Sequence, residues 1–536
     1  MRKFLLATAA GLGIAAGSTA VLAEDVADSI YGSNNDDSGQ AAPAPGTITV
    51  RLNGRFRFFA GWIGQSDANR AYYYDQNTGF ASETPFNRFV PTTRPTGSLT
   101  TPTTLAAAGY AAAPLTYNKL ADYGFGNYFR LYPGFDGVAA NGLRYGASVE
   151  IRQDNNGGAG AGRSTGGGVY GSISGESVSR GLLYIRREWG YIGTDRLGTL
   201  RVGSTDGPSG LFMVGNFENF NDGGWNGDAY TLIAGNIQPL WPFADVGQMY
   251  TTTKAIYLSP QFYGFDFGIA FEPNTGNDGN GATFGAGCNA PGFLGATYIG
   301  AGPSVAGAGC DDLASTSTAD YARRRNTVDA AIRYRGTFGP VGFAAYANYI
   351  GSGKVQDSTP RAFNALPSRF QYNGFNVGVG GAAVTFAGFT VGGMIQGGAY
   401  NGQWSLKPQG ASDATAWLAG ASYTLGPVVV GASYFASYQA GASGPLGTGP
   451  GGTSFFSQYV GQRRERGVAA GGTYSLAPGL ALFLGYLWGD RKENGFDFIT
   501  GQTQTVAATA ANPTPVGSQN NYVHSSELYL GTSFTW

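Results

Sequence analysis

The stretch "TITVRLNGRFRFFAGW", from Thr47 to Trp62, separates two kinds of side chain with a period of two residues. One parity carries Arg51, Asn53, Arg55 and Arg57, and the other carries Val50, Leu52, Phe56, Phe58 and Trp62. Since successive side chains of a β-strand point to opposite faces, the stretch predicts a strand with one cationic and one apolar face. Such a strand suits either a soluble core or a membrane wall that has water behind it.

The first residues of the chain predict a secretory signal peptide. Arg2 and Lys3 precede an uncharged stretch, 4–22, and "AVLAED" offers a small-residue cleavage site after Ala23. We therefore expect residues 1–23 to be removed, with an N-terminal membrane anchor as the alternative. Cleavage removes two positive residues and lowers the formal net charge from −1 to −3. This balance argues against a nucleic-acid partner.

The composition favours a membrane barrel over a soluble domain. Aromatic residues make up 14% of the chain and glycine occurs 89 times, while charged residues make up only 12%. That charged share is about half the usual value for a soluble domain. After the signal peptide no uninterrupted apolar run reaches about 18 residues, so no membrane helix is expected. Short strands with alternating polarity are typical of outer-membrane barrels.

The spacing of connectors supports the same fold. Short turns are predicted after Phe135, Gly193, Gly339, Ala387, Gly426 and Ala477, and long Gly/Ser/Thr/Asn-rich connectors separate the resulting hairpins. The sequence therefore predicts an all-β fold, a transmembrane antiparallel β-barrel of about sixteen strands, with short periplasmic turns and long extracellular loops. Closure leaves no unpaired backbone edge in the lipid. Residues 24–46 are expected to form a flexible acidic, then Ala/Pro-rich, leader to a barrel domain at 47–536.

An ordered series of segments resembles the general bacterial porins, most closely those of alphaproteobacteria. The segments are "TVRLNGRFRFFAGW", "NGLRYGASVEIR", "REWGYIGTDRLGTLRVGST", "KAIYLSPQFYGFDFGIAFEP" and "ELYLGTSFTW". The resemblance implies a homotrimer in the bacterial outer membrane, in contact with lipid and lipopolysaccharide, that passes small hydrophilic solutes and ions by passive diffusion. It also implies that Phe534 and Trp536 belong to a C-terminal signal read by the barrel-assembly machinery; Trp536 stands where Phe is more usual.

The resemblance further implies that the loop after the fifth strand folds into the lumen. That loop, 206–250, has no Lys, Arg or His and carries the carboxylates Asp206, Glu218, Asp222, Asp228 and Asp245. The predicted basic wall consists of Arg51, Arg55, Arg57, Arg144, Arg152, Arg201, Arg333 and Arg335. Opposed charges would set ion preference. An exposed surface loop is one alternative, and arginines that only pair with wall carboxylates are another.

Signals for chemistry or metal binding are weak. "GGAGAGRST", 157–165, imitates a phosphate-binding loop but has Arg163 where Lys belongs. The one histidine, His524, lies near Ser526, but the nearby carboxylate, Glu527, is expected on the opposite face of the strand, which disfavours a hydrolase. "EPNTGNDGNG", 272–281, is an incomplete calcium loop. We expect no enzyme activity, no cofactor and no metal.

Two cysteines, Cys288 and Cys310, fall in one predicted extracellular loop and favour a disulfide.

Taken together, these features predict a passive outer-membrane porin. A substrate-selective channel for sugars or anionic solutes, or a barrel-based adhesin or receptor, is the alternative. Ion preference stays open, because the wall arginines favour anions while the acidic loop and the net charge favour cations.

Overall fold

The structure is a computed structural model. It describes residues 43–66, 69–74, 81–82, 116–119, 121–154, 183–233, 237–243, 252–274, 325–353, 373–401, 404, 407, 411–440, 443–448, 454–459, 462–494, 498 and 521–536. The predicted signal peptide, most of the leader, Asp245, Cys288 and Cys310 lie outside the described residues. Among the described residues, no helix is long and apolar enough to cross a membrane.

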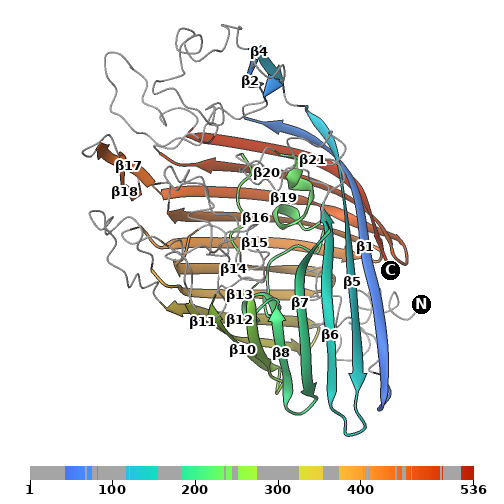
Figure 1. The fold of residues 1–536 in the computed structure, drawn as a ribbon. Helices are drawn as coiled ribbons and strands as arrows, with labels where there is room; N and C mark the ends of the chain where they lie inside the picture. The colour runs from blue at the N-terminus through green and yellow to red at the C-terminus, as the bar shows by residue number, and fades with distance from the viewer. Residues whose placement is uncertain are drawn as a thin grey trace.

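Sixteen strands close into one antiparallel barrel (Figure 1), which confirms the predicted fold class. In chain order they are β1 (Thr47–Gln65), β5 (Tyr123–Val138), β6 (Arg144–Asp154), β7 (Leu183–Thr194), β8 (Gly198–Ser204), β9 (Thr253–Leu258), β10 (Phe265–Asn274), β11 (Arg325–Phe338), β12 (Val341–Gly353), β13 (Asn376–Phe386), β14 (Phe389–Ala399), β15 (Ala414–Leu425), β16 (Val428–Ala440), β19 (Gln462–Ala477), β20 (Leu480–Lys492) and β21 (Tyr522–Thr535). Closure comes from β1, which pairs with β5 on one side and with β21 on the other.

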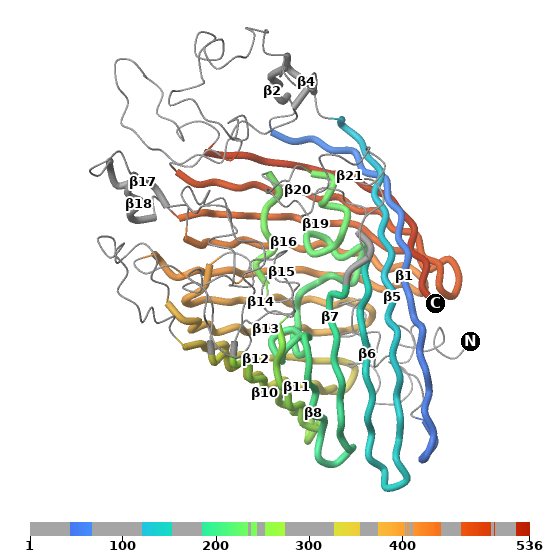
Figure 2. The backbone as a smooth tube through the Cα atoms, in the orientation of Figure 1, coloured from blue at the N-terminus to red at the C-terminus, as the bar shows by residue number. Residues whose placement is uncertain are grey.

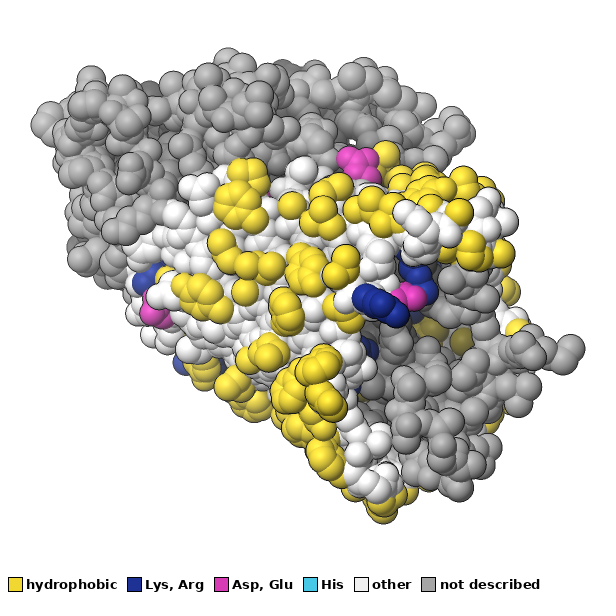
Figure 3. Space-filling view, turned by 90° about the horizontal axis from the view of Figure 1, so that it is seen from below, with side chains coloured by type: hydrophobic (Ala, Val, Ile, Leu, Met, Phe, Trp, Pro, Cys, Tyr) yellow, Lys and Arg dark blue, Asp and Glu magenta, His cyan; other side chains and the backbone are white. Residues whose placement is uncertain are grey.

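Side chains alternate between the lumen and the outer surface as the opening stretch predicts. On β1, Arg51 and Arg55 are buried inside the barrel, whereas Val50 and Leu52 are 79% and 60% exposed on the outside. On the face shown in Figure 3, hydrophobic side chains are spread over the described surface, and charged ones are confined to a few places. An apolar exterior around a polar lumen is the pattern of an outer-membrane barrel.

The turn predicted after Phe135 is wrong by three residues, because β5 continues to Val138. Its Pro133 lies inside the strand, opposite Leu52 of β1. On the other side, Tyr132 and Pro133 make no pairs with β6, while the β5–β6 register is the same on both sides of this gap. Proline has no backbone N–H, so it cannot donate a hydrogen bond to a neighbouring strand. The gap in the β5–β6 ladder accommodates this missing bond.

Two small sheets lie outside the barrel order, and the sequence did not predict them. One contains β2 (Asn69–Tyr74), β3 (Ala81–Ser82) and β4 (Thr116–Lys119), within the connector between β1 and β5. The other pairs β17 (Ser443–Thr448) with β18 (Ser454–Tyr459), between β16 and β19. Both therefore belong to long connectors, at the barrel end opposite the short turns.

Candidate functional site

The described parts of the loop between β8 and β9, residues 205–233 and 237–243, lie inside the barrel, which confirms the predicted inward fold. The loop contains α4 (Pro208–Leu211), η4 (Gly224–Asn226) and η5 (Ala229–Leu232). The helix α4 contacts β10, β11 and β12, η4 contacts β19 and β20, and η5 contacts β1 and β5. Figure 2 shows this green segment between β1 and β5–β7 on one side and β13–β20 on the other. The loop thus crosses the lumen and touches opposite walls.

Aromatic side chains fasten the loop to the wall made by β13–β20. A Cβ added at Gly431 of β16 would lie 2.2 Å from the Phe220 ring, and one at Gly420 of β15 would lie 2.7 Å from Phe217. Trp225 packs against Gly467 of β19 in the same way and donates its indole N–H to the Val468 carbonyl at 3.0 Å. Each buried ring contributes about 1.5–3 kcal/mol through removal of apolar surface from water. We call Gly420, Gly431 and Gly467, the lumen-facing wall glycines on which these rings pack, the glycine seats.

A tight turn presents the acidic tip of the loop to the other wall. The Asn221 side chain accepts the backbone N–H groups of Gly223 and Gly224, at 3.0 and 2.9 Å. Both glycines have positive φ, 112° and 63°, which disfavours other residues there. The Asp222 carboxylate accepts hydrogen bonds from the backbone N–H groups of Asp228 and Ala229, each at 2.8 Å. The Tyr529 hydroxyl of β21 also donates a hydrogen bond to this carboxylate, at 2.5 Å. The sequence of the turn therefore fixes where the two carboxylates lie.

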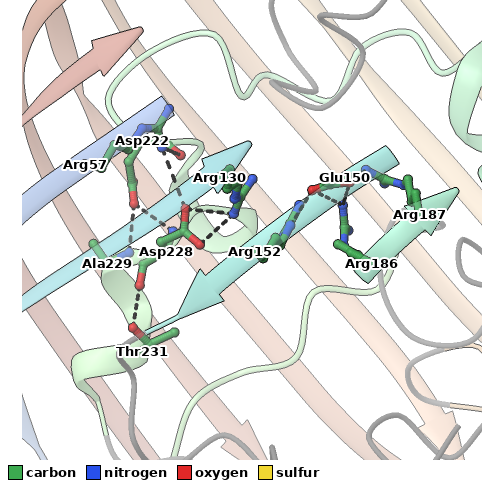
Figure 4. Close-up of polar contacts among 10 residues, drawn as sticks. All are labelled: Arg57, Arg130, Glu150, Arg152, Arg186, Arg187, Asp222, Asp228, Ala229 and Thr231. Atoms are coloured by element: carbon green, nitrogen blue, oxygen red, sulfur yellow. Dashed lines mark hydrogen bonds and ion pairs between the residues drawn. The ribbon is translucent and has the colours of Figure 1, made fainter. Parts of the chain in front are cut away.

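Arginines of β1 and β5 meet this tip (Figure 4). Arg130 donates to the Asp228 carboxylate at 3.0 Å, and Arg57 donates to the Asp222 carbonyl oxygen at 2.8 Å. Arg55 has its guanidinium 5.4 Å from the centre of the Tyr128 ring. No carboxylate lies within ion-pair distance of Arg55 among the described residues. Loop and wall thus form direct ion pairs, with one arginine left uncompensated.

A second network centres on Glu150 of β6, which is completely buried. Its carboxylate pairs with Arg152, with Arg186 at 3.4 Å and with Arg187 at 2.8 Å. The β6–β7 register shifts at Glu150, and this irregularity lets the consecutive residues Arg186 and Arg187 both reach the same carboxylate. Arg187 also pairs with Asp206, at the start of the loop, at 2.8 Å. The network therefore fixes the start of the loop to the barrel wall.

The backbone register brings three arginines into one cross-strand row. Arg55 of β1 lies opposite Arg130 of β5, and Arg130 lies opposite Arg152 of β6. Like charges that face each other directly on neighbouring strands destabilise a sheet. Counting Arg57, Arg186 and Arg187 as well, six arginines lie around the four carboxylates Glu150, Asp206, Asp222 and Asp228, and five of them, all except Arg55, pair with one. Among these ten residues the arginines outnumber the carboxylates by two. We call the three facing residues the arginine row.

The two tip carboxylates respond differently to the same surroundings. Burial raises the pKa of the Asp222 carboxyl above its ordinary value, against the effects of Arg57 and of the hydrogen bonds from Tyr529 and Ala229. Burial also acts to raise the pKa of Asp228, but Arg130, Arg57 and Arg55 outweigh it and hold that pKa below its ordinary value. Asp228 is therefore the carboxylate at the loop tip whose negative charge is stabilised by the arginines of the barrel wall.

Other members of the predicted wall lie elsewhere. Arg51 pairs with Asp136 of β5 at 2.6 Å, and Arg201 lies 5.3 Å from the Trp189 ring centre. Arg333 and Arg335 share Asp266, at 2.7 and 3.0 Å, and Arg333 also donates to the Leu211 carbonyl of α4 at 3.4 Å. Arg144 pairs with Asp195 at the turn end and is 45% exposed there.

The remaining predicted residues have structural contacts. Glu218 accepts the Asn226 side-chain amide within the loop, at 2.9 Å. Phe534 packs against Phe56 of β1. Trp536 exchanges backbone hydrogen bonds with Gly54, at 3.1 and 3.2 Å. The sequence-based list omitted Arg130, Arg186 and Arg187, because a strand register and its irregularities cannot be read from one strand at a time.

The family model described as Gram-negative porin matches residues 7–494. The chain belongs to the Gram-negative porin family. This porin therefore forms an outer-membrane channel for passive diffusion, and its place is the bacterial outer membrane. No curated protein has a sequence that matches it.

Several solved porin structures are similar to this chain at low identity. The anion-selective porin from Comamonas acidovorans has 12% identity and a TM-score of 0.43, with 91% of this chain and 100% of that chain covered. OmpF of Salmonella typhi in complex with daunomycin has 12% identity and a TM-score of 0.43, with 91% and 97% covered. OmpT of Vibrio cholerae, folded in vitro and titled a trimer form, has 10% identity and a TM-score of 0.40, with 91% and 99% covered.

Proposed function

We propose that this porin favours small anionic solutes over cations. The observation that carries the proposal is the arginine row, Arg55, Arg130 and Arg152, which faces the lumen beside the loop. A row of like charges costs stability, so its presence calls for a benefit. An anion that sheds part of its hydration can accept charge-assisted hydrogen bonds from such guanidinium groups.

Neighbouring carboxylates keep this attraction moderate. Asp228 neutralises part of the row through Arg130, and Glu150 does so through Arg152. Conduction requires binding that is favourable enough for entry and weak enough for release. Partial neutralisation of the arginine row by these carboxylates fits that requirement. If the channel is substrate-selective, the arginine row favours an anionic solute over an uncharged sugar as its substrate.

The remaining parts of the proposal concern assembly and chemistry. We infer a homotrimer, in contact with outer-membrane lipid and lipopolysaccharide and inserted by the barrel-assembly machinery. The channel carries out no enzymatic step. An apolar exterior on β1, with Val50, Leu52 and Trp62 exposed, supports burial of that face against lipid or another copy. Stepwise closure of one third of the conductance in a planar bilayer would support three equal pores.

The reversal potential across a potassium chloride gradient tests the ion preference. We expect the sign of an anion-favouring channel. Replacement of both Arg55 and Arg130 with glutamine should move the potential toward cation preference. The matched control is Arg144→Gln, because Arg144 lies at the turn end and pairs with Asp195. A cation-favouring wild-type channel, or equal shifts in both variants, would overturn the proposal.

A further inference from the structure

A group of charged side chains lies on the outer face of β19, β20 and β21, where the long connectors begin. Register pairing forms two adjacent rows on this face: Arg464 with Lys492 and Tyr522, and Arg466 with Asp490 and His524. The next rows toward the short turns contain Val468 with Trp488 and Ser526, and then Ala470 with Tyr486 and Leu528. The outer face thus changes from aliphatic through aromatic to charged. Aromatic side chains at that transition are typical of the membrane interface.

One carboxylate serves two arginines in this group. Asp490 is completely buried and accepts from Arg464 at 3.3 Å and from Arg466 at 3.0 Å. The Arg466 guanidinium also lies 5.9 Å from the Trp488 ring centre. The two arginine side chains keep 25% and 31% of their surface exposed. Both therefore have a fixed position and donor groups open to the exterior.

Lys492 makes the group electrically incomplete. It is exposed at the end of β20 and forms no ion pair among the described residues. It also lies directly opposite Arg464, a like-charge pair that destabilises the sheet without a counter-ion. Three cations against Asp490 leave two positive charges unmatched on the outward face. An anion placed between Arg464 and Lys492 would remove this repulsion.

We propose that Arg464, Arg466 and Lys492 bind the phosphate group of an anionic lipid in the outer leaflet. The site has the depth of a headgroup, since it borders the aromatic rows at the loop end of the barrel. Phosphate accepts several charge-assisted hydrogen bonds at once, and guanidinium groups match its geometry. The proposal rests on the lipid contact inferred above and gives that contact a position, independent of ion preference in the lumen.

The test counts bound lipid by native mass spectrometry while detergent-solubilised porin is titrated with diphosphoryl lipid A. Since each basic residue near a membrane surface contributes about fivefold in affinity, Arg464→Gln should weaken binding about fivefold. Lys492→Glu reverses a charge and should weaken it about 25-fold. Arg144→Gln, at the opposite end of the barrel, should bind lipid like wild type. Lipid A without phosphate groups should bind weakly to every variant.

The Lys492→Glu variant separates an effect on lipid binding from an effect on folding. The new carboxylate would face Arg464 and form an attractive cross-strand pair, so the thermal stability of the barrel should be kept or increased. Its conductance and reversal potential should equal those of wild type, which keeps this test distinct from that of the lumen.

Four results would overturn the proposal. They are equal lipid affinity in wild type and Lys492→Glu, equal binding of phosphate-free lipid A, tight binding of inorganic phosphate alone, and loss of the oligomer in Lys492→Glu with unchanged lipid affinity. The third result would indicate a free-anion site, and the fourth would indicate an interface between copies.

Discussion

Arg55 on β1 lies directly opposite Arg130 on β5, and both guanidinium groups contact the same Tyr128 ring, at 5.4 and 4.5 Å from its centre. Only Arg130 has a carboxylate, Asp228, as a partner. The ring faces attract both cations, but they do not remove the repulsion between them. Stability and the proposed anion preference are therefore opposed at Arg55.

Replacement of Arg55 by glutamine should reveal this opposition. We expect the barrel to gain about 1 kcal/mol of stability, because a like-charge cross-strand pair disappears. The same variant should lose part of its anion preference. Thermal unfolding in detergent and the reversal potential in a planar bilayer measure the two effects. A variant that loses stability as well as anion preference would show that Arg55 has a structural counter-ion.

Glu150 should be far less tolerant. Glu150→Gln leaves Arg152, Arg186 and Arg187 around a neutral amide in a completely buried position. Breaking a buried ion pair on one side costs about 3–5 kcal/mol, so we expect poor recovery of folded barrel. Adding Arg186→Gln should restore part of the yield, since one unmatched charge is removed. Equal yields of the single and double variants would contradict this network.

The glycine seats should control the position of the loop. Gly431→Ala places a methyl group against the Phe220 ring, and overpacking of this kind costs about 1–3 kcal/mol. We expect a lower unfolding temperature. We also expect a changed single-channel conductance, because Asp222 and Asp228 at the loop tip would move together with Phe220. Gly378→Ala is the matched control, since an added Cβ there meets no atom within 4 Å. If both variants conduct alike, the rings do not position the loop.

Acid should release the loop only at low pH. The pKa of Asp228 lies below the ordinary aspartate value in the folded protein. Its ion pair therefore adds stability that is complete above that ordinary value, about 3.9, and is lost as the pH falls through the lower folded value. The difference in conductance between wild type and Asp228→Asn should persist at pH 5 and vanish in stronger acid. A difference that vanishes above pH 5 would refute the depressed pKa.

Local patterns in the sequence predicted much of this fold and less of the site. The period of two at Arg51 to Phe58 assigns each side chain to the lumen or the exterior, because that choice depends on one strand alone. The turn predicted after Phe135 was wrong because β5 continues to Val138, and the gap that accommodates Pro133 lies in the ladder with the neighbouring strand β6. The arginine row depends on the register of three strands, and the double engagement of Glu150 depends on a β6–β7 irregularity. Neither property is visible within a single segment.

The pairing of β1 with β21 has a consequence for biogenesis. Gly54 and Trp536 exchange hydrogen bonds across almost the whole length of the chain, so this seam is the most non-local contact of the sheet. Such contacts carry the largest loop-closure entropy and form late. Until the seam is made, both of its strands expose backbone groups that invite pairing with other chains. We therefore expect the unfolded chain to need protection from such pairing until β1 and β21 have joined.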